Sequence, residues 1–240
     1  MLVEVCANSL ESAMNAEKAG ADRIELCSEL GVGGITPSYG LLKTIADKIS
    51  IPVRVLIRPR SGDFMYSNLE VDIMMKDIQC CKDLGFEGVV LGMLQNDFKI
   101  DQNRFYEIQE ISHGLQLTFH RAFDWVSNPF DAFIQIKNFN VDTLLTSGQQ
   151  STAIEGIDLL SELNQDSGDV VIMPGSGVNP SNAHLFKEKG FKAIHLSATK
   201  MHKKLNTLPN LPMSSPKLLS DDSVFISHLE TIQEVIAIVK

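Results

Sequence analysis

The sequence lacks the features that mark several classes of protein. No apolar run among its 240 residues approaches the length of about 20 that a membrane-spanning helix needs. Lys and Arg number only 21 against 30 Asp and Glu, and the net charge of −9 leaves no basic excess for nucleic acid. The opening residues Met1–Cys6 hold no basic segment of the kind that begins a secretory signal. We therefore expect a cytoplasmic protein with neither a membrane nor a nucleic acid as partner.

Cysteine is scarce as well, with four residues: Cys6, Cys27, Cys80 and Cys81. In a reducing cytosol they are free thiols, so no disulfide framework is expected. Cys80 and Cys81 are neighbours in a helical pattern and point in different directions, which indicates two packing residues. Cys6 and Cys27 differ from them because each ends a short apolar strand pattern.

An alternation of short apolar runs and amphipathic stretches fills the chain. Eight runs predict strands: Leu2–Cys6, Arg23–Cys27, Val53–Ile57, Gly88–Gly92, Gln116–His120, Thr143–Ser147, Val170–Met173 and Ala193–Ser197. The stretches between and after them predict helices: Ser9–Ala19, one starting near Pro37, Leu69–Leu84, Gln102–Ser112, Pro129–Asn138, Ile154–Asn164, Pro180–Lys189 and Ser223–Val239. Eight even units predict an α/β fold, a single (β/α)8 TIM barrel over residues 1–240. A doubly wound open sheet is the alternative.

One long segment interrupts the alternation after the eighth strand. Thr199–Asp222 contains three prolines and several serines and has no regular period. Its place at the carboxyl end of a strand suggests a lid over the mouth of the barrel, and a mobile surface excursion is an equal alternative.

The first two strands end in the same pattern, Glu-X-Cys. Alternation puts Glu and Cys of each strand on one face, and neighbouring strands lie about 4.8 Å apart, so Cys6 and Cys27 can meet inside the barrel. Glu4 and Glu25 then lie one layer lower. Arg54 of the third strand would share that interior and needs a charge partner, which Glu4 or Glu25 can supply.

Other polar side chains also follow strand ends, where barrel enzymes place their active sites. Local positive charge in an acidic protein suggests a small anionic ligand, held by residues of the strand ends: Arg58, Arg60, Arg121, Ser147, Gly175, Gly177 and Ser197. Candidates for proton transfer are Glu25, His120, Asp124 and His195. For Asp124 the alternative is a structural ion pair with Arg121 or Arg60.

A set of short motifs resembles the CutC family, long labelled copper homeostasis proteins. The motifs are Glu4–Cys6, Ala16–Glu17, Gly20–Ser28, Gly33–Ser38, Ile57–Arg60, Gly62–Phe64, Tyr66–Ser67, Phe119–Asp124, Leu145–Gly148, Met173–Val178 and His195–Ala198. The resemblance implies a TIM barrel, a cytoplasmic location and a homo-oligomer, a dimer or tetramer. It also implies that Cys6 and Cys27 are copper(I) ligands. Ser61 and Ser176 replace glycines common in the family, and the chain beyond about residue 202 shows little resemblance.

Two functions therefore compete. The resemblance favours a copper homeostasis protein that binds Cu(I) through Cys6 and Cys27, with Met65, Met93, Met173 or His120 as helpers. The arginines and histidines favour a lyase, isomerase or hydrolase that acts on a small anionic metabolite, with or without a phosphate group. We predict no organic cofactor, and leave open whether the protein is an enzyme or a noncatalytic regulatory barrel.

Overall fold

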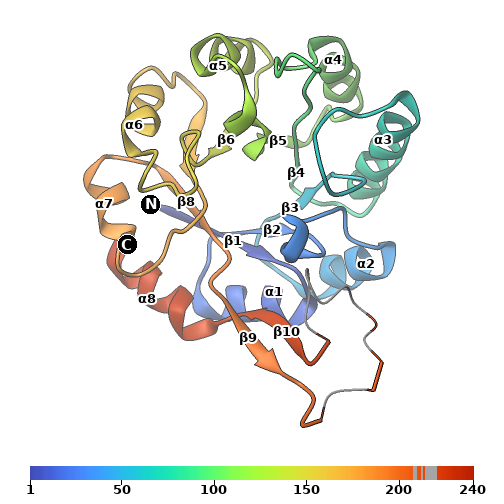
Figure 1. Cartoon of the computed structure of the whole chain (residues 1–240), viewed down its shortest axis with the longest axis vertical. Coiled ribbons are helices and arrows are strands. Elements are labelled where there is room, and N and C mark those ends of the chain that lie inside the picture. The colour runs from blue at the N-terminus through green and yellow to red at the C-terminus, as the bar shows by residue number, and fades with distance from the viewer. Residues whose placement is uncertain (208–209, 212, 214–220) are drawn as a thin grey trace.

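The computed structural model describes residues 1–207, 210–211, 213 and 221–240. Eight parallel strands form one sheet in the order β7-β6-β5-β4-β3-β2-β1-β8, which curls into a nearly closed barrel (Figure 1). The strands are β1 (Leu2–Ala7), β2 (Arg23–Leu26), β3 (Val53–Leu56), β4 (Gly88–Leu91), β5 (Gln116–Phe119), β6 (Thr143–Thr146), β7 (Val171–Pro174) and β8 (Ala193–Leu196). The predicted TIM barrel is confirmed.

Helices surround the sheet and cover its outer face. They are α1 (Leu10–Ala19), α2 (Tyr39–Lys48), α3 (Asn68–Asp83), α4 (Gln102–Ile111), α5 (Pro129–Asn138), α6 (Ile157–Gln165), α7 (Ala183–Glu188) and α8 (Leu229–Val239), with 3-10 turns η1 (Leu30–Val32) and η2 (Arg121–Trp125). Local chemistry explains their ends. Ser67 and Glu70 form a capping box at the start of α3, and Gly20 ends α1 with a left-handed φ of 90°.

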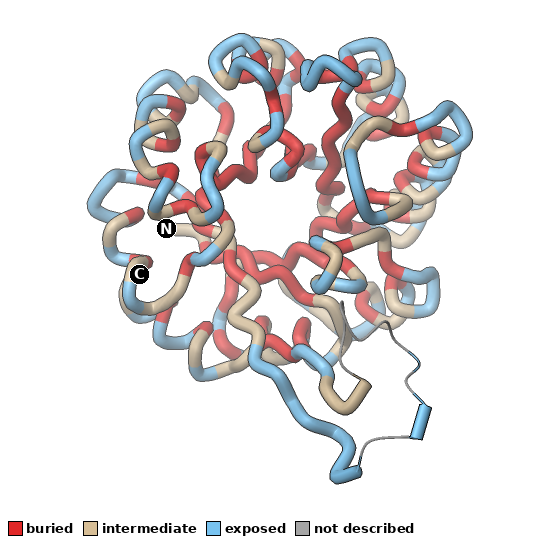
Figure 2. Tube along the Cα trace, in the orientation of Figure 1, coloured by how far each residue is buried: buried red, intermediate tan, exposed pale blue. Residues whose placement is uncertain are grey.

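The apolar core lies between the strands and the helices. Figure 2 shows buried residues in the barrel strands and along the inner sides of the helices, with exposed residues on the outside. Phe105, Phe119 and Phe139 pack together in this layer, with ring centroids 4.5–5.9 Å apart, and each is at most 1% exposed. Burying one such side chain contributes roughly 1.5–3 kcal/mol to the free energy of unfolding.

Charged residues fill the base of the barrel interior and are paired there. The Arg23 guanidinium donates to Glu4 over 2.5 Å. Arg54 donates to the hydroxyls of Thr118 and Thr143 and forms an ion pair with Glu87 at 3.2 Å. The predicted partnership of Arg54 with Glu4 or Glu25 is therefore wrong: Arg23 takes Glu4, and Glu87 approaches Arg54 from the turn before β4.

The segment after β8 is more regular than the sequence suggests. Thr199–Lys203 forms β9 and pairs antiparallel with β10 (Ser223–Ser227). The predicted helix Ser223–Val239 is accordingly shorter and begins at Leu229, capped by His228. In Figure 1 this hairpin extends outward past α1 and away from the barrel centre. The lid prediction for Thr199–Asp222 also covers 208–209, 212 and 214–220, which lie outside the described residues.

None of the helices in the described part of the chain has the length and apolar character needed to cross a membrane.

Candidate functional site

A cavity of about 590 Å³ opens at the carboxyl ends of the barrel strands. It is lined by residues from seven of the eight strand ends or their loops, and from the start of α8. They include Cys6, Glu25, Cys27, Leu56, Arg58, Phe64, His120, Arg121, Trp125, Leu145, Ser176, Gly177, Asn179, His195, Ser197 and Thr231. A pocket of this size and mixed lining is typical of a small-ligand site.

The two predicted strand-end thiols meet in this cavity. Cys6 Sγ and Cys27 Sγ lie 3.6 Å apart, and the residues are 5% and 0% exposed. Leu56 and Val90 pack around them. The contact with Cys27 and burial raise the pKa of the Cys6 thiol well above its usual range. The Cys6 thiol is therefore protonated at neutral pH, and both cysteines line the cavity.

A glycine permits this packing. Gly34 has a left-handed φ of +84°, and a Cβ there would lie 2.7 Å from Leu56 Cδ2 and 3.3 Å from Cys27 Cβ. Any larger residue would both strain the backbone and push on the wall that holds the thiols.

The stagger of the barrel separates the roles of the two glutamates. Adjacent strands of a closed barrel are offset along their axes, and here Cys6 of β1 is level with Glu25 of β2, while Glu4 is level with Arg23. Glu25 therefore lies beside the Cys6 thiol rather than one layer below the pair, which corrects the predicted layering.

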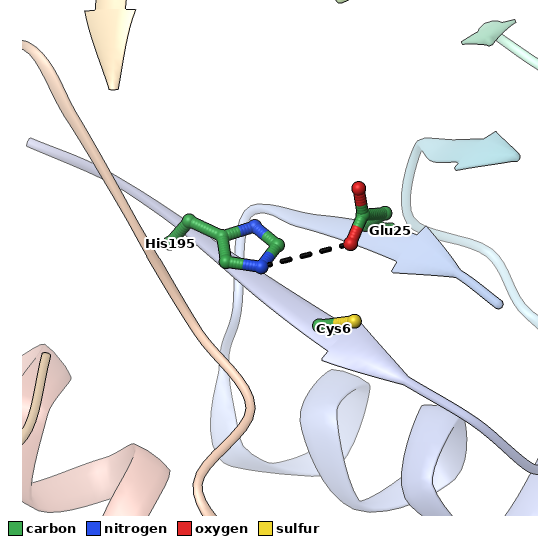
Figure 3. A group of neighbouring side chains, drawn as sticks. All are labelled: Cys6, Glu25 and His195. Carbon is green, nitrogen blue, oxygen red and sulfur yellow. Dashed lines mark ion pairs between the residues drawn. The ribbon is translucent and has the colours of Figure 1, made fainter. Parts of the chain in front are cut away.

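His195 of β8 lies between these two glutamates. Its Nδ1 is 2.8 Å from Glu4 Oε1, and its Nε2 is 3.6 Å from Glu25 Oε2 (Figure 3). Register explains the first contact, because β1 pairs with β8 so that Glu4 is level with His195. The predicted site residues Glu25 and His195 are thus brought together, and with Cys6 they form one cluster.

The charges of this cluster shift one another's pKa values. Burial alone would raise the pKa of Glu4, but the hydrogen bonds and charges of His195 and Arg23 outweigh it and lower that pKa to about 2. Burial raises the pKa of Glu25. Burial opposes a charged His195, yet attraction to Glu25 and Glu4 raises its pKa overall. The cluster can therefore exchange protons or hold a cation.

The arginines on the opposite side of the mouth are committed to backbone contacts. Arg58 donates to the carbonyls of Val32, Gly34 and Gly62 over 2.8–2.9 Å. Arg60 does not line the cavity and instead pairs with Glu70 and Asp63 while donating to three loop carbonyls. Both side chains order the loops that follow β2 and β3.

The carboxylate of Asp124 is likewise hydrogen-bonded to groups of the protein. It accepts from Arg121, from the hydroxyls of Thr146 and Ser147, and from the amides of Ser147 and Gln149. Arg121 also donates to the Ser147 hydroxyl over 2.9 Å. The structure brings these predicted residues together as a network that ties the loop after β6 to η2.

His120 contrasts with its neighbours because one ring nitrogen is unused. Nδ1 accepts from the Ala122 amide, whereas the buried Nε2 has no hydrogen-bond partner among the described residues. Burial and the nearby charge of Arg58 lower the pKa of His120 to about 3, so the ring is neutral. The Phe64 ring packs against the His120 ring, with 4.9 Å between the ring centroids, and also contacts Trp125. Together these rings give the cavity an aromatic wall.

The polar groups of the glycine-rich loop after β7 form hydrogen bonds with one another. Gly177 has a φ of +75°, and its carbonyl accepts from the side chains of Asn179 and Asn182. The Asn179 amide in turn donates to Asn182. Gly175 passes close to β6, where a Cβ would lie 2.4 Å from Leu145 Cδ1. The remaining predicted residue, Ser197, lines the cavity 3.4 Å from the Thr199 hydroxyl.

Sequence reasoning missed three contributors to the site: Arg23, Glu4 as the partner of His195, and Trp125. Arg23 lies two residues before Glu25 on β2, so both side chains are on the same face of the strand. This spacing alone assigns Arg23 to the interior. The position of Trp125 depends on η2, for which the apolar pattern contains no signal.

Comparison with known proteins identifies the relatives of this chain. The model of the CutC family matches residues 1–200. A CutC family protein of Enterobacter sp. (strain 638) is 47% identical over 83% of this chain and 81% of its own length. One of Serratia proteamaculans (strain 568) is 46% identical over 82% of this chain and 78% of its own.

A solved structure agrees with these matches. CutC of Streptococcus agalactiae, described as a candidate copper homeostasis protein, has a TM-score of 0.77 and 34% identity, and the alignment covers 82% of this chain and 98% of that one. Thiamine phosphate pyrophosphorylase of Pyrococcus furiosus has a TM-score of 0.62 over 99% of this chain and 95% of its own, at 15% identity, which shows the shared barrel alone. The predicted resemblance is confirmed.

Proposed function

This chain belongs to the CutC family, and on that basis we propose that it serves copper homeostasis by binding Cu(I) through Cys6 and Cys27. The observation that carries the proposal is the 3.6 Å separation of the two thiols at the cavity floor. Soft thiolate ligands select Cu(I) over harder cations. Copper is here the cargo of the protein rather than a resident cofactor.

The surroundings of the thiols fit this cargo. Both cysteines line the cavity, so an ion has a path to the pair, and Leu56 and Val90 pack against them as an apolar support. Metal binding releases the thiol protons, because only thiolates are ligands. His120 lines the same cavity with a neutral ring and an unused Nε2, which makes it a candidate third ligand. Met173 is not among the described residues that line the cavity, and its sulfur accepts from Arg23.

The alternative, an enzyme for a phosphorylated anion, has weaker support. Its arginines Arg58, Arg60 and Arg121 donate to protein groups, and the loop at Gly177 is occupied by its own asparagines. Tight anion sites instead offer free guanidinium edges or free backbone amides.

Anaerobic titration with a chromogenic Cu(I) chelator tests the proposal. We expect one Cu(I) per chain, and a loss of affinity greater than about 100-fold in Cys6→Ala and in Cys27→Ala, more than the loss of a supporting residue brings. Cys80→Ala and Cys81→Ala are matched controls on α3 and should bind like the wild type. Unchanged Cu(I) affinity in folded Cys6→Ala or Cys27→Ala would refute the assignment.

The cytoplasmic location and the homo-oligomer stay predictions. Sedimentation of the purified chain tests the expected dimer or tetramer.

A further inference from the structure

We propose that Cys6, Glu25 and His195 form a second metal site, for a divalent cation of the zinc type, which shares Cys6 with the thiol pair. The inference goes beyond Cu(I) binding and does not depend on it. Its basis is a convergence of three different ligand types from three neighbouring strands, β1, β2 and β8.

The donor atoms lie close enough to contact one ion. One ligand atom from each of the three residues falls within 4.8 Å of the other two. Figure 3 shows the carboxylate of Glu25 facing the imidazole of His195, with the Cys6 sulfur beside them. The offset of β1 against β2 produces this arrangement, since it brings Glu25 level with Cys6.

The chemistry of the set differs from that of the thiol pair. Zinc is bound by thiolate, imidazole and carboxylate together, whereas two thiolates alone favour Cu(I). The mouth thus holds two overlapping ligand sets: sulfur with sulfur, and sulfur with nitrogen and oxygen. Which set is used depends on the ion.

His195 is oriented as metal-binding histidines are. Its Nδ1 is fixed by Glu4 at 2.8 Å, which leaves Nε2 directed at Glu25 and Cys6. Glu4 is itself held by Arg23 and is fully buried, so it acts as a positioning residue and not as a ligand. A carboxylate behind the imidazole is the usual support of a histidine ligand, since it fixes the tautomer and the ring direction.

The cavity supplies the remaining coordination position. Three protein ligands with one open position are typical of zinc sites that act on a bound molecule, whereas structural zinc has four protein ligands. All three residues line the 590 Å³ cavity, so a water or an oxygen of a small molecule can reach the ion. Thiolate and carboxylate together also balance the charge of a divalent cation.

Titration of the reduced, full-length protein with Co(II), a spectroscopic substitute for Zn(II), tests the site. We expect one Co(II) per chain, with visible absorption of four- or five-coordinate Co(II) and a thiolate-to-cobalt charge-transfer band. Zn(II) should displace it. His195→Gln and Glu25→Gln should each lower the Co(II) affinity by more than about 100-fold, beyond the loss expected from a supporting residue.

A crossed comparison separates the two sites. Cys27→Ala should keep Co(II) binding with its sulfur band while losing Cu(I), and His195→Gln should keep Cu(I) while losing Co(II). Binding of Cu(I) but no Co(II) by the wild type would overturn this inference and leave the copper proposal standing. Co(II) binding that depends on His195 without Cu(I) binding would do the reverse. A Co(II) spectrum without the sulfur band, or one unchanged in folded His195→Gln, would also overturn the inference.

Discussion

On the β1–β2–β8 half of the mouth, Cys6, Glu25 and His195 contact one another and leave ligand atoms facing the cavity. On the β3–β5–β6 half, Arg58 and Asp124 are of equally functional types, yet every oxygen of Asp124 and most donors of Arg58 bind the protein itself. Both halves follow strand ends of the same barrel. The difference is whether the polar atoms are already bonded.

This contrast explains why polar residues at strand ends are a weak guide to function. A barrel needs its loops ordered, and charged side chains that reach backbone carbonyls do this well. A binding site needs the opposite, atoms that remain available in a buried place. We therefore assign stability to the β3–β5–β6 half and propose ligand binding for the β1–β2–β8 half.

The largest effect is expected for Glu4, which pairs with Arg23 and holds His195 in place on the β1–β2–β8 half. Glu4→Gln removes the charge that pairs with buried Arg23 and His195, and breaking a buried pair costs about 3–5 kcal/mol. Urea unfolding measures the loss, and Co(II) affinity of the folded fraction should fall about 10–100-fold. Asp47→Asn, which removes the charge of the exposed Lys43–Asp47 pair on α2, is the control and should leave the urea midpoint close to that of the wild type. Equal stability of Glu4→Gln and wild type would contradict the assigned role.

Arg58→Ala should cost about 2–3 kcal/mol in urea unfolding, since it strips charged donors from the carbonyls of Val32, Gly34 and Gly62. Cu(I) stoichiometry should not change. A variant that is as stable as the wild type but no longer binds a small anion would break the comparison, because Arg58 would then bind a ligand rather than stabilise the loops.

How far the sequence alone leads depends on the range of the interaction. The strands followed from local apolar periodicity, and the thiol pair followed from alternation within β1 and β2 together with the spacing of neighbouring strands. The pairing of Glu4 with Arg23 and His195 did not, because it depends on barrel stagger and on β1 lying beside β8. The paired positions Glu4 and His195 are 191 residues apart in the sequence.

The contacts of Arg58 and Asp124 were less predictable still. They end on carbonyls and amides of loops whose path has no periodic signal. A structural role was therefore an alternative for Asp124 alone, and Arg58 was predicted only as a ligand-binding residue. The hairpin of β9 and β10 was missed for a related reason, since its strands are short, half polar and separated by a long connection.

Asp124→Asn should cost about 2 kcal/mol. The amide keeps the shape of the side chain but turns one acceptor into a donor, which then faces the hydroxyls and amides that Asp124 now accepts from. Thermal unfolding measures the change, with Asp131→Asn on α5 as an exposed control. Full stability with altered chemistry at the site would make Asp124 catalytic instead.

The smallest effect concerns His120 and pH. Its pKa is about 3 in the folded protein and near 6.5 when unfolded, so the unfolded chain gains a proton first as the pH falls. Stability is then lost as the pH drops from 6.5 toward 3, by about 1 kcal/mol at pH 5.5. Urea unfolding of His120→Asn at several pH values should show a shallower slope. An unchanged slope would mean that another group is responsible.

The most direct measurement is crystallographic: anomalous diffraction at the copper edge from crystals grown anaerobically with Cu(I). We expect a single peak between Cys6 Sγ and Cys27 Sγ. A peak beside His120 or the arginines, with none at the thiols, would contradict the assignment of ligand binding to the β1–β2–β8 half.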